Sequence, residues 1–210
     1  MWVGTKLSMH YLIFDFDGVL GDTDEARKRV IAKMENKSQE QILKESNNYF
    51  SKPAHTRSHN LTPVEILELY RWTHRFGYEM LEIGYNLFDG FIQEILKIED
   101  CKKAIVSSGN KVYINQIKSS GLEFTHILDM FDHHSKEEKV EQICRDWGVD
   151  ISEAYYFTDT QTDVLELSEI MDPAKIIGCS WGYQGFEKLN QVLPESQILQ
   201  QFSDIHKIII

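Results

Sequence analysis

Short apolar runs alternate along the chain with longer stretches in which apolar residues recur every three or four positions. The runs lie at residues 11–15, 103–109, 126–130, 154–159 and 175–179. Consecutive apolar residues over such short lengths are typical of strands that are buried on both faces of a parallel sheet. Because helical periodicity fills the segments between the last four runs, the sequence predicts an α/β fold with a doubly wound parallel sheet.

The stretch between the first and second runs has a different pattern. Residues 22–48 have helical periodicity, and residues 62–65 supply the cap, the proline and the acidic first turn of a further helix. No strand candidate occurs within residues 22–83, so we expect an α-helical cap inserted there. The core domain would then consist of residues 1–21 and 84–210.

Two groups of side chains in this insertion are candidates for contact with a ligand. Trp72, Phe76 and Met80 lie at helical spacing, which favours a place in the insertion's own core over a substrate face. The polar segment between the helices carries His55, Arg57 and His59. These three residues have the chemistry to recognise an anionic group, but a solvated loop explains them equally well.

The charge of the chain is unevenly distributed. Of 33 acidic and 22 basic residues, ten of each lie in residues 22–83, so the net charge of −11 belongs to the rest of the chain. Such acidity argues against a nucleic-acid partner. The insertion is the part better suited to attract an anionic substrate.

Composition favours a folded protein of the cytoplasm. Hydrophobic residues make up 42% of the chain, which is ample for a core. Cys101, Cys144 and Cys179 form no CxxC pair, as expected of reduced thiols. The run at residues 11–15 is too short for a signal peptide, and no stretch approaches the roughly 18 apolar residues of a membrane span. Residues 1–8 form a polar leader that is either native or a remnant of cloning.

The first apolar run ends in two carboxylates, Asp15 and Asp17, which Gly18 follows. Residues two apart on a strand point to the same side, so both carboxylates face one way where a buried strand meets solvent. Two carboxylates this close repel each other unless a cation or a shared proton relieves them. The pattern therefore indicates a metal-dependent active site.

Polar groups also follow the other predicted strands. The binding crevice of a doubly wound sheet lies at the carboxyl ends of its strands. The residues expected there are Asp15, Asp17, Ser107, Lys136, Asp159 and Asp163. Oxygen ligands suit Mg²⁺, and a lysine with a hydroxyl suits a phosphoryl group. The sequence has no GxxxxGK[ST], no GxGxxG after the first strand and no HExxH, which disfavours P-loop, dinucleotide and zincin sites.

These segments resemble the four motifs of the haloacid dehalogenase superfamily. Motif I is matched by residues 14–20, motif II by Ser107, motif III by Lys136 and motif IV by residues 158–163. Residues 87–91 resemble the return from a helical cap, and residues 179–183 resemble a turn of phosphoglycolate-phosphatase-like members. The resemblance extends over about residues 9–205 and implies a Rossmann-like core with an α-helical cap.

The resemblance also implies a role for each matching residue. Asp15 would attack phosphorus to give an aspartyl-phosphate, and Asp17 would protonate the leaving alcohol and then activate water. The cofactor would be Mg²⁺, bound by Asp15, the backbone carbonyl of Asp17 and Asp159. Ser107, Ser108 and Lys136 would hold phosphoryl oxygens, and Asp163 would support Lys136 or waters on the metal. The substrate would be a small phosphorylated metabolite, and the enzyme a monomer or homodimer.

Several alternatives stay open at this point. Thr158 stands where the family usually has glycine, and Lys139 rivals Lys136 because one helical turn separates them. A phosphosugar mutase on the same scaffold and a non-catalytic binding or regulatory protein are the other functions considered. A dehalogenase is disfavoured because its chemistry needs neither a second acid nor a metal. His133-His134 are expected to be surface histidines, since adjacent side chains diverge and no third ligand is evident.

Overall fold

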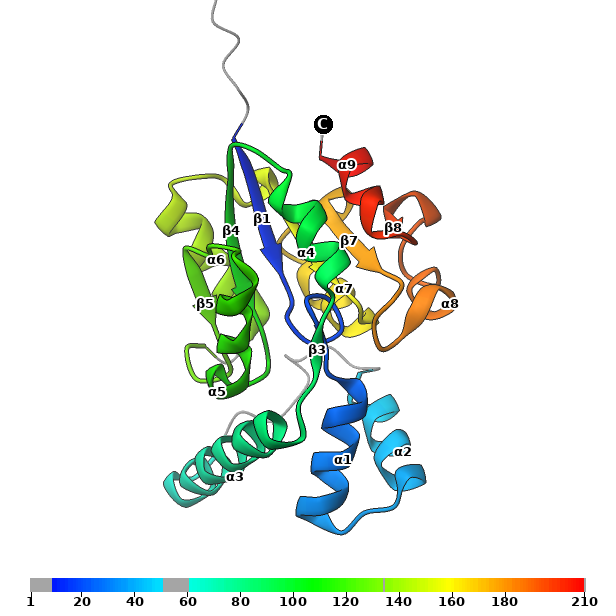
Figure 1. The fold of residues 1–210 in the computed structure, drawn as a ribbon. Helices are drawn as coiled ribbons and strands as arrows, with labels where there is room; N and C mark the ends of the chain where they lie inside the picture. Colours follow the sequence, from blue (N-terminus) through cyan, green and yellow to red (C-terminus); the bar gives the residue numbers. More distant parts are fainter. Residues whose placement is uncertain (1–8, 51–60, 134, 210) are drawn as a thin grey trace, which may run out of the picture.

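A computed structural model describes residues 9–50, 61–133 and 135–209 of the chain. Six strands form one parallel sheet in the order β5-β4-β1-β6-β7-β8 (Figure 1). The strands are β1 His10–Phe14, β4 Cys101–Val106, β5 His126–Leu128, β6 Ala154–Thr158, β7 Ile176–Cys179 and β8 Ile198–Leu199. The predicted parallel sheet is confirmed, and the strand that carries the paired aspartates lies inside it.

Consecutive apolar residues in β1 pack alternately into the hydrophobic clusters on the two faces of the sheet. Leu12 and Phe14 belong to the cluster on one face of the sheet, and Ile13 belongs to the cluster on the other face. All three side chains have no solvent-exposed surface. Because successive side chains of a strand point to opposite faces, a strand covered on both sides needs apolar residues at every position.

Helices cover both faces of this sheet (Figure 1). Apolar side chains of α4 Asp89–Leu96, α5 Lys111–Ile114 and α9 Ile205–Ile208 join the cluster of Phe14. Those of α6 Lys136–Trp147, α7 Gln161–Leu167 and α8 Gly185–Leu189 join the cluster of Ile13. Short 3₁₀ helices occupy Asn115–Ser120, Ile151–Glu153, Pro173–Lys175, Glu195–Gln197 and Phe202–Asp204.

The segment between the first two strands of the sheet lies beyond their carboxyl ends (Figure 1). It contains α1 Asp24–Glu35, α2 Gln39–Tyr49 and α3 Pro63–Ile83. A two-residue antiparallel ladder of β2 Gly21–Asp22 and β3 Asn86–Leu87 joins its two ends. This position is the one expected of a cap. The assignment of residues 22–83 to a separate domain remains a prediction.

Two details of the predicted insertion are wrong. The helical pattern of residues 22–48 is divided into two helices, because Asn36 adopts the left-handed conformation with φ 51° and ends α1. Ser38 then starts α2 with a capping box that Gln41 completes. The expectation of no strand also fails at the edge, since Asp22 pairs with Asn86 in the ladder.

Other differences concern the ends of elements. The helical segment expected between the second and third apolar runs is the short α5 followed by a 3₁₀ helix at Asn115–Ser120. The sixth strand, β8, has two residues and shows no pattern that sequence reasoning could detect. The strand predicted at residues 103–109 ends at Val106, so Ser107 stands just past the strand.

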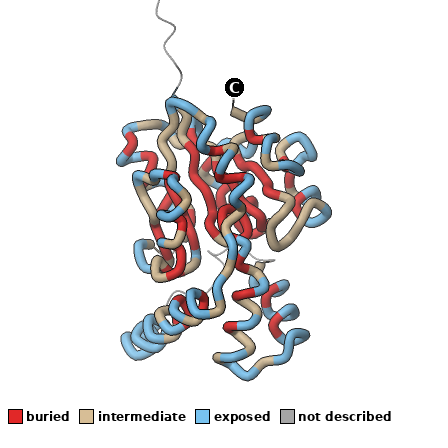
Figure 2. Tube along the Cα trace, viewed as in Figure 1, coloured by how far each residue is buried: buried red, intermediate tan, exposed pale blue. Residues whose placement is uncertain are grey.

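Among the described residues of the insertion, no separate core is present. Phe76 and Met80 of α3 belong to the same buried cluster as Phe14 of the central strand, and Trp72 packs against that cluster. The expected separate core is therefore wrong, because the base of the insertion continues the core of the sheet. In contrast, residues 61–71 at the start of α3 are all exposed (Figure 2).

Two expectations from composition can be compared with the structure. Cys101, Cys144 and Cys179 are free thiols, as predicted. No helix within the described parts of the chain is long and apolar enough to cross a membrane.

Candidate active site

The carboxylate of Asp15 lies at the carboxyl end of β1 and is almost fully buried. Its Oδ1 accepts a hydrogen bond from the backbone N–H of Phe16, at 2.7 Å. Its Oδ2 lies 2.6 Å from the ammonium of Lys136. A buried carboxylate paired with a cation at a strand end is the type of group that the sequence predicted there.

Lys136 joins two of the predicted acids. Its Nζ lies 2.6 Å from Asp15 and 2.6 Å from Asp163, and its side chain is only 6% exposed. Its backbone N–H, in the first turn of α6, donates to Glu166 Oε1 at 2.9 Å. The lysine is therefore fixed at both ends, and Asp163 is one of the two acids that hold its ammonium.

Thr158, which replaces the usual glycine, takes part in this arrangement. Its hydroxyl donates to Asp163 Oδ2 at 2.6 Å and accepts the backbone N–H of Thr160 at 3.1 Å. As the last residue of β6 it has an extended backbone, which a β-branched side chain favours. The substitution thus adds a donor that holds Asp163 toward Lys136.

Burial dominates the electrostatics of the Asp15–Lys136 pair. It raises the pKa of Asp15 well above its ordinary value, and Lys136 opposes that shift. Burial also disfavours the charged form of Lys136, but Asp15 and Asp163 outweigh it and raise the pKa of this lysine. Lys136 is therefore held as a cation, and a further positive charge would stabilise the ionised form of Asp15.

Lys139, the rival candidate, occupies a different environment. It is buried behind Ser107 and donates to the carbonyl of Ser107 at 2.9 Å. Burial and the nearby charge of Lys136 lower the pKa of Lys139 to about 8. The geometry therefore favours Lys136 over Lys139 as the lysine that faces a phosphoryl group.

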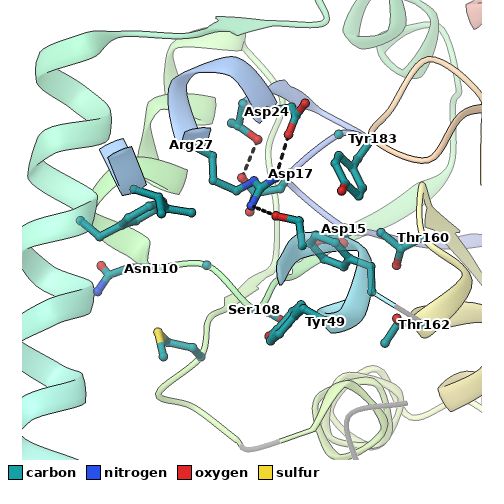
Figure 3. Close-up of a pocket in the computed structure, with 18 of the residues that line it drawn as sticks. Asp15, Asp17, Asp24, Arg27, Tyr49, Ser108, Asn110, Thr160, Thr162 and Tyr183 are labelled. Atoms are coloured by element: carbon teal, nitrogen blue, oxygen red, sulfur yellow. Dashed lines mark hydrogen bonds and ion pairs between the residues drawn. The ribbon is translucent and has the colours of Figure 1, made fainter. Parts of the chain in front are cut away.

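The two serines after β4 differ in exposure. Ser107 has no exposed surface, and its hydroxyl accepts the backbone N–H of Gly109 at 2.8 Å. Ser108 is exposed and lines a cavity of about 500 Å³. Asp15, Asp17, Lys136, Asp159 and Asp163 line the same cavity. Figure 3 labels Asp15, Asp17 and Ser108 among the lining residues. The structure thus brings the predicted residues together, with Ser107 just behind the wall that Ser108 forms.

Three hydroxyl groups surround the carboxylate of Asp17. Thr23 donates to Oδ1 at 2.7 Å and Tyr113 donates to Oδ2 at 2.8 Å, while Ser107 lies 3.4 Å from Oδ2. Tyr113 is buried, and its hydroxyl occupies the space that a side chain at Gly109 would need. Sequence reasoning missed Tyr113, because its spacing from Asp17 reveals nothing of this contact.

Asp159 follows β6, beside the end of β1, and is 2% exposed. Its Oδ2 accepts the backbone N–H of Tyr183 at 2.6 Å. Burial raises the pKa of Asp159 to about 7, although this hydrogen bond works in the opposite direction. Gly18 and Gly182 enclose the carboxylate so closely that a Cβ at either position would collide with it. The turn at residues 179–183 therefore forms one wall of the site.

The oxygen groups at this point fit a small divalent cation. Asp15 and Asp159 are buried carboxylates at the ends of neighbouring strands, and the partner of Asp159 described above is an uncharged N–H. Within residues 9–50, 61–133 and 135–209, no three Asp, Glu, His or Cys side chains form a metal-binding group. A cation here would therefore need backbone or water oxygens besides the two carboxylates, which is the usual manner of Mg²⁺.

The histidine candidates contribute little to this picture. His133 contacts Gln142 of α6 through its Nε2. His134 lies outside the described residues, as do His55, Arg57 and His59 of the polar segment. Their predicted roles are therefore not addressed by the structure.

Similar proteins were identified from the sequence and from the fold. The family model described as haloacid dehalogenase-like hydrolase matches residues 12–166. No curated protein matches the sequence significantly. Among solved structures, a predicted phosphoglycolate phosphatase from Haemophilus somnus 129pt has a TM-score of 0.69 at 17% identity, covering 96% of this chain and 98% of its own.

Two further solved structures share the fold. A predicted phosphatase from Clostridium acetobutylicum has a TM-score of 0.67 at 19% identity, covering 96% of this chain and 99% of its own. A mutant of CbbY from Rhodobacter sphaeroides, crystallised with xylulose-(1,5)bisphosphate, has a TM-score of 0.62 at 17% identity, covering 94% of this chain and 96% of its own. At these identities the similarity establishes the α/β fold.

We expect Asp159→Asn to raise the free energy of unfolding of the metal-free protein at about pH 8 by on the order of 2 kcal/mol. The pKa of Asp159 rises from 3.8 to about 7 on folding, so ionising this group destabilises the folded state as the pH rises through that range. Asparagine removes the charge and keeps an oxygen for the N–H of Tyr183. Urea denaturation with a chelator measures the difference, which should shrink as the pH falls from about 7 and nearly vanish only below about 3.8, where Asp159 is protonated in both states.

Asp163→Asn provides the matched control. Asp163 is paired with Lys136 at 2.6 Å, so its neutralisation should lower stability at the higher pH. Equal losses of stability in the two variants would contradict this account of Asp159.

Proposed function

Because the chain belongs to the haloacid dehalogenase-like hydrolase family, we propose that it is a Mg²⁺-dependent phosphatase that acts through an aspartyl-phosphate on Asp15. The observation that carries this proposal is the 2.6 Å contact between the Lys136 ammonium and the Asp15 carboxylate. The pair combines a nucleophile with a cation for the incoming phosphoryl group. Asp17 and Asp159 line the same cavity and supply the remaining groups that phosphoryl transfer needs.

Proteins of similar fold support a phosphate ester as the substrate. Two carry the name phosphatase, and the CbbY mutant was crystallised with a sugar bisphosphate. Their low sequence identity transfers no substrate to this chain, so the proposal rests on the residues of the site.

In the first step a carboxylate oxygen of Asp15 forms a bond to phosphorus, and the bond between phosphorus and the ester oxygen breaks. The carboxyl proton of Asp17 passes to that oxygen, so the product leaves as a neutral alcohol. Lys136 and Ser108 hold phosphoryl oxygens, and Ser107 shapes the backbone turn beneath them. Burial of Asp15 excludes water as a competing nucleophile.

In the second step water attacks phosphorus of the aspartyl-phosphate and gives its proton to Asp17. The bond between phosphorus and Asp15 breaks, so inorganic phosphate leaves and both aspartates return to their starting states. Thr23 and Tyr113 hold the two oxygens of Asp17 in place during this exchange. The same carboxyl group thus acts as acid first and as base afterwards.

Asp15, Asp159 and the backbone carbonyl of Asp17 are the groups that would hold Mg²⁺. When bound, the cation offsets the charge repulsion between the phosphate and Asp15 and orients both. Asp163 remains with Lys136, to which it is already bonded.

The proposal includes the setting of the enzyme. Residues 22–83 act as a cap that closes over a small phosphorylated metabolite and limits access of bulk water. The free thiols and the acidic charge support a cytoplasmic enzyme without a nucleic-acid partner. It works as a monomer or homodimer.

Asp15→Asn should lower turnover of an aryl phosphate by roughly 10³-fold or more, because an amide oxygen is a poor nucleophile. The substitution is isosteric and removes a buried charge, so the fold should persist. Phosphate release in the presence of Mg²⁺ measures the effect, and circular dichroism verifies folding.

Asp146→Asn is the control for that variant, since Asp146 is an exposed residue of α6 that pairs with His126 of β5. It should retain full activity. Metal-dependent turnover by Asp15→Asn at the rate of the unmodified enzyme would refute Asp15 as the nucleophile.

Removal of divalent metal should abolish phosphate release, and added Mg²⁺ should restore it, because two buried carboxylates otherwise repel the phosphate. Steady-state assays after treatment with a chelator test this expectation. Full activity of the chelated enzyme would contradict a metal-dependent mechanism, and isomerised sugar phosphate without release of phosphate would favour a mutase.

Tyr113→Phe should lower kcat/KM for an alkyl phosphate by about tenfold but change kcat/KM for 4-nitrophenyl phosphate by less than about threefold. An alkoxide needs the proton of Asp17 to leave, whereas nitrophenolate leaves without one. The ring contacts of Tyr113 with Phe16 and Phe76 are kept in the variant.

Tyr85→Phe is the matched control, since the Tyr85 hydroxyl donates to the carbonyl of Tyr113 at 2.6 Å. This variant should change kcat/KM for the alkyl phosphate and for 4-nitrophenyl phosphate by the same factor. Equal losses on both esters in Tyr113→Phe would indicate that the tyrosine supports the fold rather than Asp17.

A further inference from the structure

The cavity at the sheet end extends from the aspartates into the insertion and has a volume of about 500 Å³ (Figure 3). Phosphate transfer takes place at one end, so the rest of this space receives the leaving alcohol. Side chains of α1, α2 and α3 form the wall at that far end. The chemistry of this wall therefore determines which alcohol fits.

The far wall is largely apolar. Its apolar members are Ile31, Ile42, Phe50, Leu69, Trp72 and Phe76. The indole of Trp72 stacks on the ring of Phe76 with centroids 5.2 Å apart and planes inclined by 17°. Trp72 is only partly buried, so a face of this stacked pair remains for contact with a ligand. A flat apolar group is the natural complement of such a surface.

Charged side chains at the same wall already have partners of opposite charge. Arg27 donates to Asp24 and to Ser46 at 2.9 Å each. Lys37 lies 2.6 Å from Glu35 and 2.6 Å from Glu45. The charges of these two cations are thus already offset by carboxylates, so the described wall attracts a carboxylate or a second phosphate less than unpaired cations would.

Two polar uncharged side chains of the wall, Thr73 and Tyr183, already form hydrogen bonds within the protein. The hydroxyl of Thr73 donates to the carbonyl of Leu69 at 2.8 Å, within its own helix. The hydroxyl of Tyr183 bonds to Asn47 at 3.3 Å. Among the described lining residues, Asn110 Nδ2 and Thr162 Oγ1 are buried polar atoms without a hydrogen bond. A sugar or polyol would lose more hydrogen bonds to water than these two groups restore, which disfavours its binding.

We propose that the preferred substrate of this site is a phosphate monoester of an apolar, aromatic alcohol, whose ring packs against the Trp72–Phe76 pair. The inference rests on the proposed phosphatase activity and adds the class of the leaving group. It also gives Trp72 and Phe76 a role in substrate contact in addition to their packing against the core.

The test compares kcat/KM for benzyl phosphate with that for glycerol phosphate and for the phosphate ester of glycolate. Benzyl alcohol and glycerol are both alkyl alcohols that need the proton of Asp17 to leave, so the comparison isolates the fit of the leaving group from its reactivity. We expect benzyl phosphate to be favoured at least about tenfold over both other esters. A preference for glycerol phosphate or for the glycolate ester would overturn the inference.

Variants locate the preference on the wall. Trp72→Ala should lower kcat/KM for benzyl phosphate by about tenfold and for glycerol phosphate by less than about threefold. Trp72→Phe should keep most of the preference. Because Trp72 also packs against the core, Leu69→Ser is a second variant: Leu69 lines the cavity and is 38% exposed, so its loss leaves the fold intact.

Tyr78→Ala is the control, since Tyr78 lies on the same helix, is 64% exposed and is not part of the wall. It should leave kcat/KM unchanged for both benzyl phosphate and glycerol phosphate. Equal losses for both esters in Trp72→Ala and in Leu69→Ser would overturn the inference. Turnover that is absent for every ester, or that survives Asp15→Asn, would instead overturn the proposed function and the inference with it.

Discussion

The ion pair of Lys136 with Asp15 is the interaction on which the site depends. One ammonium serves two buried carboxylates, Asp15 and Asp163, each at 2.6 Å. Two acids and one base leave an excess of negative charge in a place with little water, before Asp159 is counted. Such an arrangement is stable only when hydrogen bonds hold each member, and Thr158 and Glu166 supply two of them. The site therefore favours additional positive charge, and in the proposed mechanism it would bind a phosphate only together with a cation.

The sheet makes this concentration of charge possible. Asp15, Ser107 and Asp159 come from three parts of the sequence, yet each follows a strand of the same parallel sheet. This much could be predicted, because the apolar run of β1 and the two-residue spacing of Asp15 and Asp17 follow from strand geometry alone. The choice between Lys136 and Lys139 could not, since both lie on one face of α6 and only packing shows which lysine meets Asp15.

Contacts between distant segments were the features that sequence could not supply. Tyr113 meets Asp17 only because α5 packs beside the end of β1, and no local pattern encodes that approach. Trp72 has the spacing of a core residue, and it does pack on the core while also lining the cavity. The two-residue strands β2, β3 and β8 are too short for any alternation. By contrast, the break between α1 and α2 has a local signal in the sequence: Asn36 ends α1 and Ser38 caps the start of α2.

The ladder of β2 and β3 has a consequence for the variability of the cap. It pairs Gly21 with Leu87 and Asp22 with Asn86, so the chain leaves the sheet and returns to it at almost the same point. The ladder thus closes the segment that contains α1, α2 and α3 in the same way as the ends of a loop are closed. Doubling the length of such a loop adds only about 0.6 kcal/mol to the entropic cost of closing it. Helices could be gained or lost between α1 and α3 at small cost, provided that residues such as Met80 keep their places in the shared core. The carboxyl end of the sheet and the surface that we propose to select the alcohol can therefore change independently in evolution.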